Sequence, residues 1–347
     1  MLKGLRTFKG AVAAPPYTNG PYSWDQFVAF NGGMSGANTS GKVWFVDGTS
    51  GLDTNDGRSW NSAKITIQAA ITASSTGDTI YVNAIQASAG GTDPGSYTEN
   101  LIIPATKQGI SLIGVTRGRV QGGLPQIKVG TTTTSAILTV RACGCLIANL
   151  GFNGIGGTGG GILLDDDGST KTALGTSIIG CHFKNCVGTT ATNAATGGAI
   201  QWAATGGAWQ VLISGNRFYK NVGDVVLLGT SQSVPQDVVI EDNVFSGPAA
   251  STDCNLYLAG GSGMNGVIIK DNYFTAFPNV GSGTNLIYAD LTGCVGLLAD
   301  NFFAGNGYTY KAAGTGGKIP ATVLMAGNAQ EVTASGGTSS GAFSRAS

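Results

Sequence analysis

The sequence predicts an all-β solenoid, in which the chain winds through short strands one coil at a time. One pattern occurs four times: an aliphatic residue, two further residues, an asparagine, one further residue and a phenylalanine. The copies are Ile213-Asn216-Phe218, Ile240-Asn243-Phe245, Ile269-Asn272-Phe274 and Leu298-Asn301-Phe303. Their asparagines lie 27, 29 and 29 residues apart, a period typical of repeats that each supply one coil.

Stacked coils would place like residues in columns. An asparagine amide can donate to the carbonyl of the next asparagine about 4.8 Å away, so we expect a ladder inside the solenoid. Each stacked phenylalanine would add about 1.5 to 3 kcal/mol of burial. The residues of the two columns are Asn216, Asn243, Asn272, Asn301, Phe218, Phe245, Phe274 and Phe303.

Weaker copies of the pattern extend the prediction toward the N-terminus. Ile147 with Phe152 and Ile178 with Phe183 keep the spacing but lack the asparagine. At about 4.8 Å per coil, residues 79 to 325 predict roughly eight coils and a rod about 40 Å long.

Composition excludes several classes of function. Of 347 residues, 57 are glycine and only 11% are charged, with a formal net charge of zero. There is no basic run for nucleic acid and no stretch of 18 apolar residues for a membrane span. One histidine, His182, and six cysteines without tight pairs predict neither a zinc site nor a disulfide framework, and we expect no cofactor.

A short helix is predicted at residues 66–76. Ile67, Ala70 and Ile71 fall on one face at helical spacing, and Thr66 is a suitable N-cap. The helix lies between a predicted strand at 42–46 and the strand at 79–82. We therefore expect it to cover the open lower end of the solenoid, where unpaired strand edges would recruit other chains.

The same region carries a family resemblance. The runs VWFVDGTSGLDTNDGRSW, ITIQAAITAS, GDTIYV and GSYTENLII resemble the opening of right-handed parallel β-helix proteins of the pectin-lyase-like superfamily. The likeness covers residues 42–103, and the repeats continue it to about residue 306. It implies a right-handed parallel β-helix. The superfamily includes pectate lyases, other polysaccharide-active enzymes and phage tailspikes, and the chain is closest in character to the tailspike and virion proteins.

Three parts of the chain are predicted. Residues 1–40 form an N-terminal segment that either packs on its own domain or docks onto other virion proteins through its aromatic residues. Residues 41–330 form the β-helix, and residues 331–347 form a Gly/Ser-rich tail. The docking candidates are Tyr17, Tyr22, Trp24, Phe27 and Phe30. No secretory signal is recognisable at the N-terminus, which suits a protein packaged into a particle that lysis releases.

Three aspartates are the candidate catalytic residues. Asp242, Asp271 and Asp300 each precede a ladder asparagine and would stack in one column. They could act as acid and base on a glycoside or as calcium ligands of a lyase, or they could simply cap the bend. Asp165 and Asp167 could likewise share a strand face and bind a divalent ion, or belong to a solvated turn.

Two tryptophans are the candidate glycan-binding residues. Trp202 and Trp209 could stack on sugar rings, or they could be buried in the core or between subunits. The small outward residues suit lateral packing of identical rods around an axis, so we expect a homotrimer.

Two functions remain open from the sequence. The first is a phage-type virion structural protein, a tailspike, fibre or capsid decoration, that binds a host surface or a cell-surface polysaccharide. The alternative is a polysaccharide-degrading enzyme, either a tailspike depolymerase or a pectate-lyase-like lyase, that uses aspartates on the solenoid wall.

Overall fold

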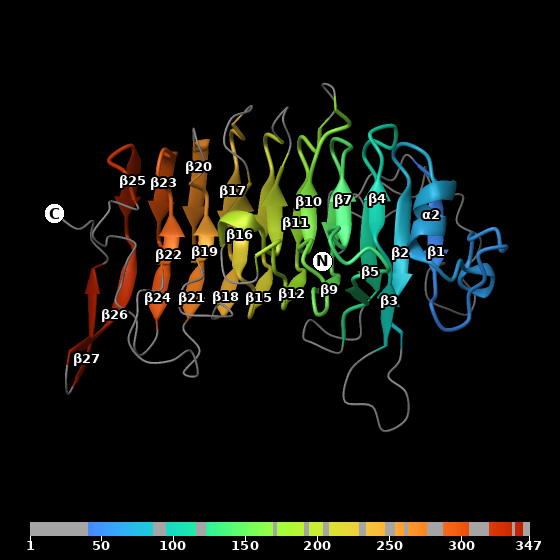
Figure 1. Ribbon diagram of the computed structural model, residues 1–347, viewed down its shortest axis with the longest axis horizontal. Coiled ribbons are helices and arrows are strands. Elements are labelled where there is room, and N and C mark those ends of the chain that lie inside the picture. Colours follow the sequence, from blue (N-terminus) through green and yellow to red (C-terminus); the bar gives the residue numbers. More distant parts are fainter. Residues whose placement is uncertain are drawn as a thin grey trace, which may run out of the picture.

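The computed structural model is a rod of stacked coils with three parallel sheets along its walls (Figure 1). It describes residues 41–85, 95–115, 123–168, 172–190, 194–203, 208–228, 234–246, 254–259, 263–275, 287–304, 319–334 and 337–342. Each coil contributes one strand to sheet A, one to sheet B and one to sheet C, and this order repeats seven times from β2 to β22. The predicted right-handed parallel β-helix of roughly eight coils is confirmed.

The strands follow chain order along the rod. Sheet A contains β1 (Val43–Val46), β2 (Thr79–Asn83), β5 (Ser111–Val115), β8 (Leu146–Ala148), β11 (Ser177–Ile179), β14 (Leu212–Ser214), β17 (Val239–Glu241), β20 (Asn265–Lys270), β23 (Val295–Ala299) and β25 (Val323–Ala326). Sheet B contains β3 (Ser96–Thr98), β6 (Gln126–Lys128), β9 (Gly151–Asn153), β12 (His182–Lys184), β15 (Arg217–Tyr219), β18 (Val244–Ser246), β21 (Tyr273–Thr275), β24 (Phe302–Ala304), β26 (Ala329–Ala334) and β27 (Gly337–Ala342). Sheet C contains β4 (Leu101–Ile103), β7 (Leu138–Val140), β10 (Ile162–Leu164), β13 (Ile200–Trp202), β16 (Gly223–Leu227), β19 (Cys254–Tyr257) and β22 (Ile287–Asp290).

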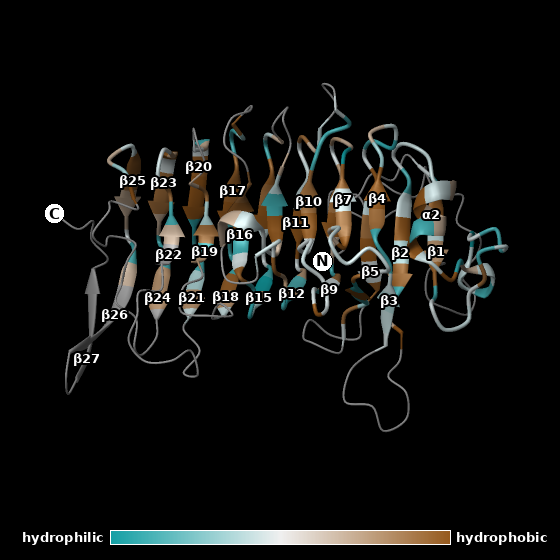
Figure 2. Cartoon of the chain, viewed as in Figure 1, coloured by the Kyte–Doolittle hydropathy of each residue, from teal (hydrophilic) through white to brown (hydrophobic). Residues whose placement is uncertain are grey.

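The interior of the rod is a column of aromatic rings beside aliphatic columns, and the strands are correspondingly hydrophobic (Figure 2). Successive rings are nearly parallel, with centroids 4.6 to 5.0 Å apart. All of them are buried. The stack consists of Phe152, Phe183, Phe218, Phe245, Phe274 and Phe303.

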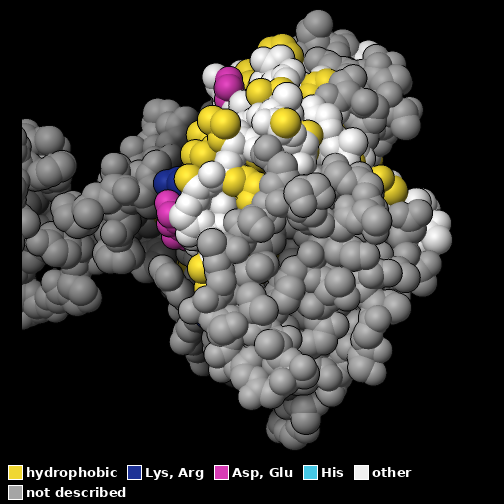
Figure 3. Space-filling model, turned by 90° about the vertical axis from the view of Figure 1, so that its left-hand side faces the viewer, with side chains coloured by type: hydrophobic (Ala, Val, Ile, Leu, Met, Phe, Trp, Pro, Cys, Tyr) yellow, Lys and Arg dark blue, Asp and Glu magenta, His cyan; other side chains and the backbone are white. Residues whose placement is uncertain are grey.

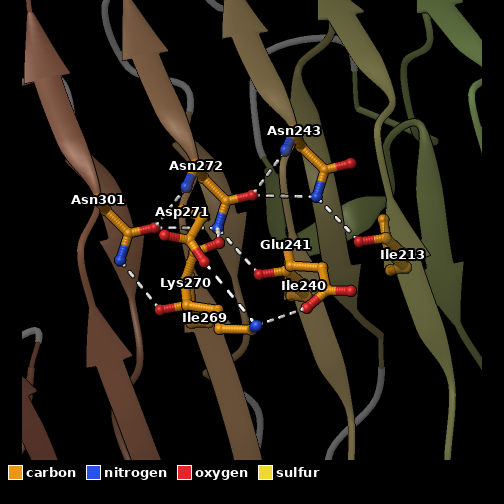
Figure 4. Close-up of polar contacts among 9 residues, drawn as sticks. All are labelled: Ile213, Ile240, Glu241, Asn243, Ile269, Lys270, Asp271, Asn272 and Asn301. Atoms are coloured by element: carbon orange, nitrogen blue, oxygen red, sulfur yellow. Dashed lines mark hydrogen bonds and ion pairs between the residues drawn. The ribbon is translucent and has the colours of Figure 1, made fainter.

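A ladder of asparagines runs beside the rings, at the bend between sheets A and B (Figure 4). Asn243 Nδ2 donates to Asn272 Oδ1 at 3.0 Å, and Asn272 Nδ2 donates to Asn301 Oδ1 at 2.9 Å. Each backbone N–H also donates to the Oδ1 above it, and each Nδ2 reaches a carbonyl of the coil below, as Asn272 does to Ile240 O. Each of these buried amides is thereby hydrogen-bonded to neighbouring asparagines and to a backbone carbonyl.

The ladder is longer than the repeat predicts. Asn301 Nδ2 donates to Asn328 Oδ1 at 2.9 Å, so Asn328 is a fifth member. The pattern hides it because Gln330 occupies the phenylalanine position of that coil, in register with Phe303. At the other end, the N–H of Cys181 donates to Asn216 Oδ1, and the coils below carry apolar residues instead.

Helix α2 (Ile67–Ala73) closes the lower end of the rod, and two short 3-10 helices, η2 (Trp60–Ser62) and η3 (Ala194–Thr196), lie in loops. Thr66 Oγ1 accepts from the N–H of Ala69, as an N-cap should. The Glu99 carboxylate accepts the N–H groups of Ile67 and Gln68 at 2.9 Å, where the helix dipole is positive. The apolar face of α2 joins the main core, so the helix covers the N-terminal end of the solenoid, as predicted.

Removing one inner amide of the ladder should destabilise the rod strongly. Asn272→Ala leaves the buried N–H of Asn243 without its partner. It also removes one hydrogen bond from the carbonyl of Ile240 and one from Asn243 Nδ2, which keeps its bond to Ile213 O. An unpaired buried group costs about 1 to 3 kcal/mol and each partial loss costs less, so we expect a loss of about 2 to 4 kcal/mol in unfolding free energy. Urea denaturation monitored by circular dichroism measures it. Ser246→Ala, on the half-buried outer face of sheet B, should change it by less than about 0.5 kcal/mol, and equal losses in the two variants would contradict the ladder's role.

His182 should make stability depend on pH. Burial first, and then the positive charges of Lys184 and Arg217, lower the pKa of His182 from 6.5 to about 4. The unfolded chain takes up this proton near pH 6.5 and the folded chain does not, so stability is full above pH 6.5 and falls as pH drops toward 4. The loss amounts to about 3 kcal/mol. Thermal or urea midpoints of His182→Gln should fall less over this range than those of the unaltered protein, and parallel curves would contradict the assignment.

Candidate functional site: a groove on the outer face of sheet C

A groove of about 540 Å³ lies along the outer face of sheet C. Its floor is one column of outward side chains, held in register by the parallel pairing of β4, β7, β10 and β13. These residues are Ile102, Thr139, Leu163 and Gln201. Because strand neighbours alternate sides, the residues flanking them, such as Leu138 and Val140, point into the core.

The walls of the groove come from the segments that connect sheet B to sheet C. They contribute hydroxyl groups from Thr132, Thr134 and Ser135 in one coil, and from Thr158 in the next. The segment with η3 adds Thr189 and Thr196. The groove thus has a mixed floor and walls lined by neutral hydrogen-bonding groups.

Gln201 is fixed by the walls rather than free to rotate. Its Nε2 donates to the carbonyl of Gly159 at 2.5 Å, and its Oε1 accepts from the N–H of Gly198 at 3.3 Å. The side chain is only 3% exposed, so it ties two neighbouring loops together. This contact preforms the groove, which lowers the ordering cost of binding a ligand.

Arg141 is the one charged residue among the described residues that line the groove. Its Nε lies 2.9 Å from Asp165 Oδ2 of the next coil, and both side chains remain partly exposed. The hypothesis of a metal site at Asp165 and Asp167 gains no support from this arrangement, because the guanidinium group of Arg141 already pairs with the carboxylate of Asp165. The described part of the chain contains no group of three or more His, Cys, Asp or Glu side chains arranged to hold a metal.

The aspartate column sits away from the groove, at the bend between sheets A and B (Figure 4). Asp242, Asp271 and Asp300 all have left-handed backbone conformations, with φ of 56°, 56° and 53°. Asn149, Gly180, Gly215 and Gly327 occupy the equivalent positions of other coils with the same sign of φ. Aspartate, asparagine and glycine are the residues that tolerate this conformation best, so the column reflects the bend and favours the turn interpretation over catalysis.

An ion-pair cluster accompanies this column. Lys270 Nζ lies 3.0 Å from Glu241 Oε2 and 3.8 Å from Asp271 Oδ2. The nearby lysine thus offsets part of the repulsion among the stacked carboxylates.

The two tryptophans do not form a sugar-stacking pair. Trp202 is 1% exposed, points into the core from β13, and donates through Nε1 to the carbonyl of Ala208. The glycan-binding hypothesis is therefore wrong for Trp202, because its ring is inside the rod. Trp209 is 39% exposed and donates through Nε1 to the carbonyl of Val234, so only this ring could meet a ligand.

Several predicted positions lie outside the described residues. The docking candidates Tyr17, Tyr22, Trp24, Phe27 and Phe30 belong to residues 1–40, which the structure does not describe. At the other terminus, β26 and β27 pair in an antiparallel hairpin that extends sheet B within the predicted tail.

Five of the six cysteines are buried thiols, and Cys143 is half-buried. Burial raises the pKa of Cys145, Cys181 and Cys186 to about 12. Because the thiolate is the nucleophile, these groups are unreactive near neutral pH.

The groove residues escape sequence analysis because they do not repeat. Ile102, Thr139, Leu163 and Gln201 share a column but no residue type. The one available signal was the run Thr131 to Thr134, part of which forms a wall of the groove.

No family model and no curated protein matches the chain. Solved structures match it in shape. A GH136 lacto-N-biosidase from Eubacterium ramulus is 10% identical, and the match covers 88% of this chain and 70% of that protein, with a TM-score of 0.40. A rhamnogalacturonan lyase is 13% identical over 77% of this chain and 69% of its own, with a TM-score of 0.33. A pectin methylesterase from Aspergillus niger is 15% identical over 84% of this chain and 86% of its own, with a TM-score of 0.34. With TM-scores of 0.40 or less, these matches carry no conclusion about this chain.

Proposed function

We propose that the protein binds a polysaccharide chain in the groove on the outer face of sheet C. The observation that carries this proposal is the groove itself, which is open to solvent, follows the rod, and combines aliphatic side chains on its floor with hydroxyl groups on its walls. The lining reaches from β4 to Leu228 beyond β16, or four strand spacings of about 4.8 Å. A channel of that length suits an extended chain of several sugar units.

The chemistry of the lining favours a neutral, hydroxyl-rich ligand. Threonine and serine hydroxyls can exchange hydrogen bonds with sugar hydroxyls. Ile102, 42% exposed, and Leu163 offer apolar contact for the C–H faces of sugar rings. Arg141 supplies a single charged donor at the edge of the floor.

Binding is favoured over cleavage by the same lining. Glycoside hydrolysis uses two carboxyl groups separated by about 5 to 9.5 Å across the scissile bond. The described groove lining contains no aspartate, glutamate or histidine, and Asp165 beside it is paired with Arg141. The polysaccharide-degrading enzyme remains the alternative, with Arg141 and Asp165 as its candidate groups in place of the aspartate column.

We further propose the setting that the sequence suggests, a phage-type virion protein that is a homotrimer. Sheet A supports self-association, because five consecutive coils place aliphatic side chains in one outward column. The column contains Leu212, Val239, Ile268, Leu297 and Leu324. Ile268 is 36% exposed and Leu324 is 69% exposed. Seen from the C-terminal end, the described surface carries many apolar side chains and few charged ones (Figure 3). Identical rods could cover the outer face of sheet A by packing side by side around an axis.

No helix in the described part of the chain has the length and hydrophobicity needed to span a bilayer.

Blocking the groove should abolish polysaccharide binding. Thr139→Trp places a bulky ring in the centre of the floor, and we expect at least a tenfold weaker affinity in electrophoresis through gels that contain candidate glycans. Ser246→Trp adds the same ring to the outer face of sheet B and should leave affinity for a neutral glycan unchanged. Equal affinity in the two variants would contradict the groove as the site. New reducing ends during incubation with the bound glycan would move the proposal to the enzymatic alternative.

The trimer is tested by the mass of the particle in solution. Light scattering coupled to gel filtration at micromolar concentration should give three times the mass of one chain. Ile268→Lys, which adds a charge to the centre of the aliphatic column, should give monomers, whereas Ser246→Lys on sheet B should leave the trimer intact. A monomeric unaltered protein would overturn the proposal.

A further inference from the structure

In a run of four coils, the outer face of sheet B carries basic residues on β6, β12 and β15, whereas β9 carries none. Lys128 of β6, Asn153 of β9, Lys184 of β12 and Tyr219 of β15 lie in one register. His182 pairs with Arg217 in the neighbouring register. Lys220 follows β15 directly, with its ammonium group 5.3 Å from the centre of the Tyr219 ring. Adjacent strands are about 4.8 Å apart, so these groups span about 14 Å along the rod.

None of the strand residues from β3 to β24 of sheet B is aspartate or glutamate. Arg141 with Asp165, and Lys270 with Glu241 and Asp271, form ion pairs away from these strands.

The nearest acidic groups belong to neighbouring elements. Asp242 lies on the A–B bend one coil above Gly215, and the Glu99 carboxylate is engaged by the end of helix α2. The lowered pKa of His182 agrees with a positive field, because Lys184 and Arg217 contribute to it after burial.

The shape and polarity of the face suit a chain of sugars better than a nucleic acid. Arg217 and Lys220 are exposed, whereas Lys184 is 6% exposed and acts mainly through its charge. Asn185 Nδ2 donates to Asn153 Oδ1 at 3.3 Å, so an amide pair lies beside the charges. Nucleic-acid sites generally need a basic domain and many phosphate contacts, but this chain has a formal net charge of zero.

We propose that the outer face of sheet B, centred on Arg217 and Lys220, is a second binding surface, which takes the carboxylate-bearing sugars of an acidic polysaccharide. Arg217 offers the planar pair of donors that matches a carboxylate. Lys220 adds a point charge beside the Tyr219 ring. This surface lies on a different sheet from the groove, so it could hold a second segment of the same polymer or a different glycan. The inference does not depend on the groove.

The test uses polygalacturonate as the acidic probe, with dextran as a neutral polymer and double-stranded DNA as a non-sugar polyanion. We expect the full-length protein to be retarded in gels containing polygalacturonate and not in gels containing dextran. Arg217→Ser combined with Lys220→Asn should weaken this affinity at least tenfold. Both changes fit the fold, because Val244 and Gly151 occupy the first position in other coils, and Asn185 occupies the second with the same left-handed conformation, φ 55° against 53°.

A control variant separates this surface from the rest of the chain. Lys270→Ser removes a positive charge that is already paired on sheet A, so it should retain full affinity for polygalacturonate. The proposal is overturned if the unaltered protein does not bind polygalacturonate, if the double variant binds it equally well, or if DNA of equal charge concentration binds at least as tightly.

Discussion

Register between successive coils is the constraint on which the whole structure depends. A parallel β-helix has no hairpins that fix the pairing of its strands, so each coil must be placed by its contacts with the coils above and below. The asparagine ladder supplies direction and register together, because Asn272 donates upward to Asn301 and accepts from Asn243 below. A slip of one residue would put an amide opposite a backbone group of the wrong type and an inward phenylalanine on the outside. The ring stack and the ladder thus enforce the same alignment of the coils. The rings do so by the fit of their packing, and the asparagines by matching hydrogen-bond donors to acceptors.

The bend between sheets A and B shows how the same constraint selects residues that look functional. The position before each ladder asparagine adopts positive φ, and so does the equivalent position in the two coils below the ladder, at Asn149 and Gly180. Aspartates at this position therefore answer a backbone requirement. Stacked carboxylates at a fixed sequence spacing are weak evidence for catalysis whenever the spacing equals the coil period.

The interior of this protein could be predicted from its sequence, and its surface largely could not. The ladder, the rings and helix α2 follow from periodic patterns, because a buried column needs the same residue type in each coil. Asn328 escaped only because Gln330 replaces the expected phenylalanine. Trp202 was ambiguous because a lone aromatic residue in a sheet C strand carries no periodic signal of its direction. The groove is assembled from residues such as Thr139, Leu163 and Gln201, which lie in three different coils and have no shared type or spacing.

This difference explains where function can be found on such a rod. Interior columns tie every coil to its neighbours, so a change there is felt along the stack, whereas outward positions between the bends are nearly independent. The three outer faces have accordingly diverged: sheet A presents aliphatic side chains, sheet B presents Arg217 and Lys220 without acidic partners on its strands, and sheet C is lined by hydroxyls around Gln201. Because the faces are rigidly related by the shared core, a long polymer that contacts two of them gains affinity from both without any ordering of the protein. A stiff solenoid is therefore suited to holding an extended ligand at several points, and that capacity arises from the same stacking that makes its interior so uniform.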